Sequence, residues 1–402
     1  MSEPKYAYRI PPCSKYDIAG MESWLEDMAA KGLYLDRDGM FFGFATFVHG
    51  RPQALRFRLE ATVNAKGHLS SVTEPEEETV ELHRMMGWDY RGRWGQFHIY
   101  VTDDPDAPEL HTDPRVQALT IQALNKFQRS QLISSLETFV ILYFFHGFIF
   151  YSLAAAWGLF LTVLAIGWAL SLPINNLIYL TQMVRLKNQL KKGIPMSHRA
   201  DWKKRSWQRY TALAADWIIG IVLVCSVLTF WGRDITEENR VPLEDWTQPI
   251  PFASVEDLFP EHEIRPEASL IDSEVHHWSN ALATDCYDYT EWREVISPEG
   301  ESFSAYIQVW YYETRYEWFA RGLARELAQQ FGGTLADRIF NHREKPQEIP
   351  GVEADYAVYY DYYAKGLILC DGTTVIRVHY NHGIDQHLTP EEVAQIYLDS
   401  IR

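Results

Sequence analysis

Histidines near the end of the chain are of the right type for a metal site. His379, His382 and His387 form an H-x2-H-x4-H pattern with Asp385 inside it, and His276-His277 lie further upstream. Zinc sites need convergent ligands held by a second shell, and this spacing matches no established zinc pattern. Exposed loop histidines are therefore the favoured interpretation, and we predict no metal and no cofactor.

Aromatic residues form a second candidate in the same part of the chain. They are Tyr356, Tyr359, Tyr360, Tyr362 and Tyr363, with Trp310, Tyr311 and Tyr312. Such a set could make a platform for a wall sugar or a peptide. Aromatic residues are also what a half-buried sheet prefers, so packing is the favoured interpretation.

The four cysteines and the short motifs predict no catalytic centre. Cys13 is expected in the cytosol, Cys225 within a membrane span, and Cys286 and Cys370 in strands outside the cell. A disulfide between the last two stays open, because sequence spacing cannot establish the geometry that a bridge requires. No nucleophile elbow, P-loop, metalloprotease motif or dinucleotide fingerprint is present, and we assign no catalytic residue.

The middle of the chain decides where these candidates lie. From Phe139 to Val184 there is no Lys, Arg, Asp or Glu. Because a bilayer core of about 30 Å needs about 20 apolar residues per helix, we predict a membrane block over residues 133–231. Its spans lie near residues 134–152, 157–180 and 212–231, with a tight turn at 153–157. The alternative, buried helices of a large soluble domain, is disfavoured by the charged flanks.

A few polar side chains interrupt these spans. His146 lies midway along the first, Asn175 and Asn176 follow Pro173 in the second, and Asp216 lies one turn into the third. Each is a functional suspect, because ionisable groups are costly in hydrocarbon. We favour His146 and Asn175 as an interhelical hydrogen bond over a proton or ion relay, and Pro173 as a kink whose freed carbonyls the amides satisfy.

Charge predicts the orientation. The loop over residues 185–209 has nine basic residues and one acid, Asp201. Short basic loops stay in the cytoplasm, so three spans place the N-terminus inside and the C-terminus outside. The first residues show no apolar signal-peptide core, which agrees with this multi-pass arrangement in the cell membrane.

The acidic charge lies entirely in the outer part. Residues 232–402 carry 13 basic and 32 acidic side chains, a balance of −19, whereas residues 1–231 carry 24 and 22. A nucleic-acid partner needs a basic face, so we expect none. The expected partners are the lipid bilayer and proteins in the cytoplasm or membrane; the sequence does not fix an oligomeric state.

Both ends of the chain predict α+β domains. Residues 1–109 contain an amphipathic helix from Asp17 to Lys31, ended by Gly32, and a second helix from a Thr73 capping box to Met86. Strand-like runs lie between and after these helices. We expect two layers, with both helices on one face of an antiparallel sheet. A separate helix over residues 110–132 then connects this domain to the membrane, as a coupling element or as a spacer.

The outer part begins with an acidic, Pro-rich linker over residues 232–268, which we expect to be extended coil. Residues 269–402 then form a second two-layer α+β domain. Its signals include a helix ending at Phe331, a hairpin turn at Asp371-Gly372 and a final helix capped by Thr389.

The first 115 residues resemble a known family. The motifs WLEDMAAKG and GWDY, together with the HTD that ends the segment, resemble the bacterial family named domain of unknown function 2812. Members resemble this chain in placing the domain before transmembrane helices. No activity is established for the family, so the resemblance carries over no catalytic residue. It also implies genes beside small transcriptional regulators, which favours regulation over metabolism.

We therefore expect a non-enzymatic membrane protein of regulatory or sensory role, linking an extracytoplasmic domain to a cytoplasmic interaction domain. Two alternatives stay open. One is an accessory subunit of a membrane transporter complex, and the other is an enzyme acting in the envelope. Neither the ligand nor any coupling between the two domains follows from the sequence.

Overall fold

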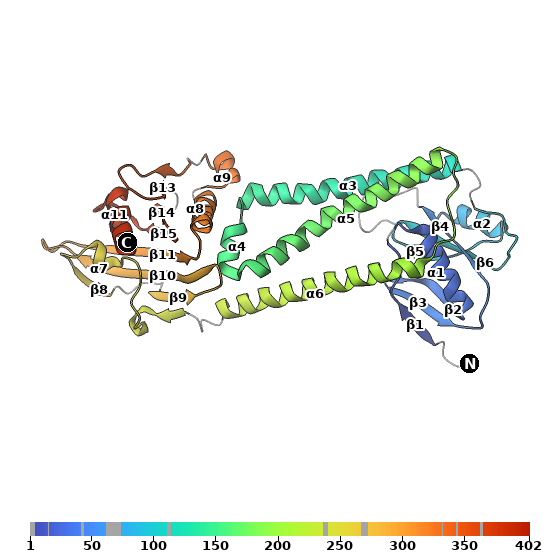
Figure 1. Ribbon diagram of the computed structural model, residues 1–402, viewed down its shortest axis with the longest axis horizontal. Helices are drawn as coiled ribbons and strands as arrows, with labels where there is room; N and C mark the ends of the chain where they lie inside the picture. Colours follow the sequence, from blue (N-terminus) through green and yellow to red (C-terminus); the bar gives the residue numbers. More distant parts are fainter. Residues whose placement is uncertain are drawn as a thin grey trace. The chain divides into compact units, whose positions relative to one another are not determined.

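The computed structural model divides into two compact units of mixed α and β structure (Figure 1). Unit 1 comprises Met1–Glu137 with Trp168–Ile219, and unit 2 comprises Thr138–Gly167 with Gly220–Arg402. The structure describes residues 5–14, 16–41, 44–61, 74–110, 114–235, 240–266, 272–331, 333–342, 345–361 and 365–402.

The N-terminal region of unit 1 contains two helices and six strands. They are β1 (Tyr6–Arg9), α1 (Ile18–Ala30), β2 (Leu33–Phe41), β3 (Phe44–His49), β4 (Arg56–Ala61), α2 (Glu77–Met85), β5 (Asp89–Trp94) and β6 (Phe97–Thr102). The predicted first helix is confirmed together with both of its end signals. The Asp17 side chain accepts a hydrogen bond from the Gly20 amide at 3.1 Å, and Gly32 has a φ of +77°.

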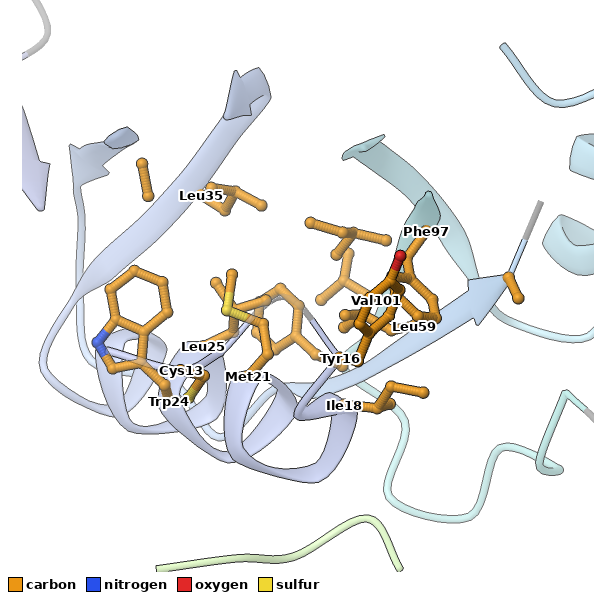
Figure 2. Packing of buried hydrophobic residues seen from close by; sticks show 14 of the residues in the cluster. Cys13, Tyr16, Ile18, Met21, Trp24, Leu25, Leu35, Leu59, Phe97 and Val101 are labelled. Carbon is orange, nitrogen blue, oxygen red and sulfur yellow. The ribbon is translucent and has the colours of Figure 1, made fainter. Parts of the chain in front are cut away.

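Helix α1 provides the centre of the unit 1 core. Met21, Trp24, Leu25 and other apolar side chains of α1 lie against Leu35, Leu59 and Phe97 of the strands (Figure 2). These apolar positions recur every three or four residues, which places them on one face of the helix. Burial of that face fixes α1 on the strands.

The predicted single sheet with both helices on one face is wrong. The strands form two antiparallel sheets, in the orders β1-β3-β2 and β4-β6-β5. The reason is visible in β6, all of whose residues are buried. Phe97, Ile99 and Val101 face the α1 core, whereas Tyr100 packs on the other side with His83 of α2, at 4.6 Å between ring centroids. A strand whose residues are buried on both faces needs cover on both faces.

The second helix is shorter than predicted. Helix α2 begins at Glu77, and its N-cap residue Glu76 makes no side-chain capping bond. The predicted capping residue Thr73 lies outside the described residues.

Three long helices follow, but their boundaries differ from the predicted ones. They are α3 (Pro114–His146), α5 (Leu159–Lys191) and α6 (Trp202–Ile235), with a short α4 (Phe150–Trp157) between the first two. The start at Pro114 is confirmed, yet the separate connecting helix is wrong, because α3 continues without a break into the apolar segment. Ala118, Ile121 and Leu124 near its start are buried in the unit 1 core.

The predicted turn at residues 153–157 is also wrong, since these residues belong to α4. The chain bends instead at Gly147 and Gly158, whose φ angles of +70° and +82° favour glycine. Pro173 lies inside α5, which continues through it. Only residues 192–201 separate α5 from α6, so most of the predicted basic loop is helical.

Two helices are long and apolar enough to cross a membrane, Leu159–Lys191 and the Trp202–Ser226 part of α6. A third span is present if α3 and α4 count as one, although the pair bends by 80° between Leu124–His146 and Phe150–Trp157. Among the described residues the chain therefore has two to three candidate spans, as expected of a membrane protein.

A nine-stranded antiparallel sheet dominates unit 2, in the order β12-β13-β14-β15-β11-β10-β9-β7, with β8 also paired to β10. The strands are β7 (Arg240–Pro242), β8 (Glu263–Pro266), β9 (Glu274–Trp278), β10 (Ala283–Ile296), β11 (Ser302–Thr314), β12 (Gln347–Glu348), β13 (Tyr356–Asp361), β14 (Lys365–Asp371) and β15 (Thr374–Tyr380).

The extended linker expected over residues 232–268 is wrong where the structure describes it. Strands β7 and β8 belong to the sheet, and a short helix, α7 (Val255–Leu258), places Val255 and Leu258 in its core. Proline at strand ends and acids at the exposed positions resemble a coil in composition, but Phe252 and Phe259 give the segment apolar anchors.

The C-terminal domain in unit 2 has three layers, a sheet with helices on both faces, where two layers were expected. One face of the sheet packs against α7 and α11 (Pro390–Ile401), and the opposite face packs against α8 (Glu317–Phe331) and α4. Strands β14 and β15 are buried on both faces, which requires this double cover. The remaining helices are α9 (Leu335–Phe340) and α10 (His382–Asp385).

Two local predictions can be compared directly. The final helix has the expected capping box between Thr389 and Glu392. The hairpin is present, but Asp371 pairs with Thr374, so the two turn residues are Gly372 and Thr373, one position later than predicted.

Candidate functional sites: two buried carboxylate junctions

The most polar buried site of unit 1 centres on Glu22 of α1, whose side chain is fully buried. Its carboxylate accepts a hydrogen bond from the Leu59 amide at 2.8 Å and lies 2.8 Å from Nδ1 of His198. One turn later, Glu26 accepts from the Phe57 amide at 3.4 Å. Strand β4 is an edge strand, so two carboxylates spaced by four on α1 bind alternate amides along its free edge.

Arg58 and Glu109 complete the charge balance of this site. The guanidinium of Arg58 binds Glu109 in two places, Nε to Oε2 at 2.7 Å and Nη2 to Oε1 at 2.8 Å, and lies 4.0 Å from Glu22. The hydrogen bond from Arg58 lowers the pKa of Glu109 to about 2. Burial raises the pKa of Glu22 despite the nearby His198 and Arg58. The pKa values of these two carboxyl groups, which belong to one network, are thus shifted in opposite directions.

His198 comes from the segment that joins α5 to α6. The same segment donates from the Ala200 amide to Oγ of Ser23 at 3.1 Å. The first residue of α6 continues the contact, with Nε1 of Trp202 donating to Asp27 at 3.0 Å. We call these contacts between residues 198–202 and the Glu22, Ser23 and Asp27 side of α1 the α1 junction. It fastens the connection between two candidate spans to the N-terminal region.

The α1 junction was not predicted from the sequence. The available signal was charge: Glu22, Glu26 and Asp27 lie close together on α1, and the loop predicted over residues 185–209 is basic. We expected that basic charge to meet lipid or cytosol.

Unit 2 contains a second buried carboxylate that holds a helix. Glu326 of α8 accepts hydrogen bonds from the Tyr151 amide at 2.8 Å and the Ser152 amide at 2.7 Å, and also from the Ser152 hydroxyl. These amides belong to the first turn of α4, where backbone N–H groups have no partner within the helix. Burial raises the pKa of Glu326, against these hydrogen bonds.

The other end of α4 is held as well. Nδ2 of Asn280 donates to the Ala155 carbonyl at 2.6 Å, and Nε1 of Trp278 donates to the same oxygen at 3.3 Å. Between the two ends, Ala154 and Ala155 are buried against α8. We call this set of contacts the α4 junction. An eight-residue helix is too short to be stable alone, so unit 2 supplies the partners at both of its ends.

Gly322 explains how α4 and α8 approach so closely. A Cβ atom at this position would lie 2.3 Å from the ring of Tyr151. Glycine inside a helix costs about 1 kcal/mol relative to alanine. Its presence in the middle of α8 is therefore explained by the packing of Tyr151.

The histidines considered as a candidate metal site do not converge. His379 contacts Tyr360 and Arg377, His382 lies 3.6 Å from Asp385, and His387 stacks on Phe303. His276 and His277 lie on β9, where His277 pairs with Asp285. Among the described residues, no group of three or more His, Cys, Asp or Glu side chains could hold a metal ion.

The aromatic residues considered as a candidate platform are divided between the two faces of the sheet. Tyr311 lies on the α11 side, while Tyr360 and Tyr312 lie on the α8 side. On the α8 side, the buried guanidinium of Arg377 stacks between Trp310 and Phe331, at 3.8 and 3.3 Å from their ring centroids. Of the other tyrosines, Tyr356 packs on the α8 side and Tyr359 on the α11 side, and Tyr362 and Tyr363 lie outside the described residues.

Arg377 also affects His379. Its Nη2 lies 3.0 Å from Nε2 of His379. Burial, with the nearby charge of Arg377, lowers the pKa of His379 to about 3. His379 is therefore neutral over the physiological range and acts as a hydrogen-bonding partner inside an aromatic cluster.

The cysteines are free thiols, and all four lie in the described residues. Cys286 and Cys370 are both buried on the α8 side of the sheet, but β11 and β15 lie between their strands. Three strand spacings amount to about 14 Å, twice the largest Cα separation that a disulfide allows. Sheet order thus excludes the bridge that the sequence left open.

Among the polar residues of the spans, Asn176 makes the interhelical contact. Nε2 of Gln128 on α3 donates to Oδ1 of Asn176 on α5 at 3.0 Å. The kind of contact is the one expected, but the pair is not His146 with Asn175. His146 is exposed at the end of α3, and Asp216 is exposed on α6.

The fold and junctions together define an α+β protein that has, within the described part of the chain, two to three helices apolar enough to span a membrane. Residues 17–133 match the model of a family described as a protein of unknown function (DUF2812), so this segment of the chain is a DUF2812 domain. The match ends within α3 and does not include His198. No curated protein and no solved structure matches the chain.

Proposed function

We propose that the protein is a multi-pass membrane protein with a regulatory or sensory role and no enzymatic step. Its C-terminal region meets an extracytoplasmic ligand or partner, and its N-terminal DUF2812 domain contacts a cytoplasmic protein. The nine basic residues over 185–209, at the ends of α5 and α6 and between these helices, support this orientation.

One observation carries the proposal: each folded region holds, through a buried carboxylate, a segment that adjoins a candidate span. Glu22 holds the connection between α5 and α6, and Glu326 holds α4, the connection between α3 and α5. Helix α5 is shared by both junctions along the chain. A ligand that favours one arrangement of α4 would therefore change the strain on α5 and bias the α1 junction.

The orientation is tested with reporters fused at each end of the chain. A reporter that works only outside the cytoplasm should be active after Arg402 and silent before Met1. Activity at both ends, or only before Met1, contradicts the orientation. A purification from gently solubilised membranes then identifies the cytoplasmic partner, and recovery of a large transporter complex instead supports an accessory subunit.

Coupling between the α4 junction and the α1 junction is tested by hydrogen–deuterium exchange in the full chain in lipid nanodiscs. Gly322→Leu should displace Tyr151 and loosen the α4 junction, and amides around residues 198–202 should then exchange faster. Glu301→Gln, at an exposed turn of the same sheet, is the matched control and should change neither junction. If faster exchange in Gly322→Leu stays confined to α4 and α8, the two junctions are not coupled.

A further inference from the structure

The exposed large apolar side chains of the C-terminal region are concentrated in one place. Among the described residues after 240, all of them lie between Tyr316 and Phe340, on or beside α8 and α9. They are Tyr316, Trp318, Phe331, Leu335, Ile339 and Phe340, and we call them the α8–α9 face. Phe340 is 67% exposed and Trp318 is 59% exposed. Clustered exposure of this kind marks an interaction surface, because scattered single residues would need no explanation.

This face lies where an apolar helix ends. The Phe340 ring contacts Phe144 of α3, with 5.9 Å between centroids, and Nε2 of Gln329 lies 3.4 Å from the Tyr143 hydroxyl. Phe144 belongs to the uncharged run of α3, two residues before the helix ends at His146. If α3 crosses the bilayer, Phe340 lies level with the boundary of the hydrocarbon.

If α3 and α5 both cross the bilayer, the α4 junction gives the same placement. Helix α4 is flanked by the ends of α3 and α5, and an eight-residue helix is about 12 Å long. Two membrane helices that end on either side of so short a helix keep α4 at the membrane surface. Since α8 packs directly on α4, α8 lies there too.

Composition and charge fit a lipid headgroup layer. Trp318 stacks on Tyr316 with 6.0 Å between centroids, and tryptophan and tyrosine are the residues enriched at membrane interfaces. Residues 315–345 carry six basic and four acidic side chains, a balance of +2 within a region whose total is −19. The stretch that carries the apolar face therefore lacks the acidic excess of the region as a whole.

We propose that the α8–α9 face rests on the outer surface of the bilayer, with Trp318, Ile339 and Phe340 in the headgroup layer. The C-terminal region is then held flat against the membrane by α4 and by this face. The inference rests on the proposed membrane placement and goes beyond it, because a domain on a flexible stalk would not touch lipid.

The test uses the full chain with Cys225→Ser, reconstituted at one copy per nanodisc and labelled at single cysteines with an environment-sensitive fluorophore. Ile339→Cys reports on the face, and Glu301→Cys, exposed on the β10–β11 turn, is the matched control. Ile218→Cys, exposed on α6, reports on insertion. Lipids carrying a nitroxide in the headgroup or deep in the acyl chain act as quenchers.

We expect headgroup quenchers to reduce the Ile339→Cys signal by about half and to leave Glu301→Cys unchanged. Phe340→Cys should repeat the result if Ile339→Cys folds poorly. Equal, negligible quenching at Ile339→Cys and Glu301→Cys, with Ile218→Cys quenched by the deep nitroxide, overturns this inference but keeps the membrane placement. Shielding of Ile339→Cys only at two copies per disc assigns the face to a second copy and also overturns it. Loss of deep quenching at Ile218→Cys removes the membrane placement itself.

Discussion

Both junctions attach a segment next to a candidate span to a folded region, but the contacts that attach it differ in chemistry. At the α1 junction, Glu22 faces the ionisable side chains His198 and Arg58, and the Ala200 amide and Trp202 indole donate hydrogen bonds to α1. Met196 and Trp202 also pack, partly buried, against the unit 1 core. At the α4 junction, Glu326 binds backbone amides and a hydroxyl, and Ala154 and Ala155 are buried beside it. The α1 junction thus centres on charged groups with partly buried apolar contacts beside them, whereas the α4 junction contributes fully buried residues to a hydrophobic core.

This difference indicates which junction can open. Polar contacts exchange for water at small net cost, whereas separating α4 from α8 exposes apolar surface. We therefore expect the α1 junction to be the reversible one and the α4 junction to be permanent. In a regulatory protein, the reversible contact is the one that a partner or a signal can change.

The largest loss of stability is expected for substitution of Glu22. Glu22→Ala leaves His198, Arg58 and the Leu59 amide without this acceptor in a buried site, and should lower the stability of the N-terminal region by about 3 kcal/mol. Pulse proteolysis in denaturant, read on fragments of that region, measures the change. Glu78→Ala, on the exposed side of α2, should change stability by less than about 0.5 kcal/mol. Equal effects of the two variants would falsify the buried-junction account.

A smaller effect is expected at Glu326. Glu326→Ala removes the acceptor for two amides of α4 and should destabilise the α4 junction by about 2 kcal/mol. The readout is exchange at the Tyr151 and Ser152 amides, with the exposed Glu317→Ala on the same helix as control. If α4 exchange is the same in both variants, apolar packing alone holds the helix.

Trp202→Phe is expected to have a weaker effect still. It keeps an aromatic ring but removes the 3.0 Å hydrogen bond to Asp27, worth about 1 kcal/mol. Exchange should rise at residues 198–202 and leave the α1 core unchanged. Trp207→Phe, on the exposed surface of α6, provides the comparison. A global loss of protection in Trp202→Phe would mean that the junction cannot open by itself.

The sequence predicts the local elements well where the pattern is periodic and capped. Helix α1 has apolar residues every three or four positions between Asp17 and Gly32, and α11 has the Thr389 capping box; both lie where expected. Charge-free length likewise identifies the long helices, because no tertiary information is needed to count apolar residues.

What the sequence could not supply is how elements are covered. The apolar residues on both faces of β14 indicate double burial, but not which helix provides it. Ala154 and Ala155 have the composition of a membrane span, yet they are buried against α8. The reason for glycine at position 322 is the packing of Tyr151, which the sequence does not show. The junction partners Glu22 and His198 are 176 residues apart, so no local pattern could pair them.

Lowering the pH should change the stability contributions of Glu326 in unit 2 and Glu109 in unit 1 in opposite directions. Burial raises the pKa of Glu326 above its usual 4.5, so the folded state binds this proton more tightly than the unfolded state. Its contribution is fully present below pH 4.5 and is lost as pH rises through the folded pKa. The pKa of Glu109, lowered to about 2 by Arg58, has the opposite effect: its contribution is present above pH 4.5 and is lost as pH falls toward 2.

Glutamine variants isolate these two contributions, since neither side chain can then titrate. Relative to Glu326→Gln, the wild-type chain should lose stability in unit 2 as pH rises above 4.5. Relative to Glu109→Gln, it should lose stability in unit 1 as pH falls below 4.5. Pulse proteolysis of the full chain, read on fragments from each unit between about pH 3 and about pH 7, gives the slope of stability against pH for both units. Slopes of the same sign would mean that the Glu326 carboxyl is held as an anion by the α4 amides. The α4 junction would then be electrostatic, like the α1 junction, and the contrast between a polar junction and a core junction would disappear.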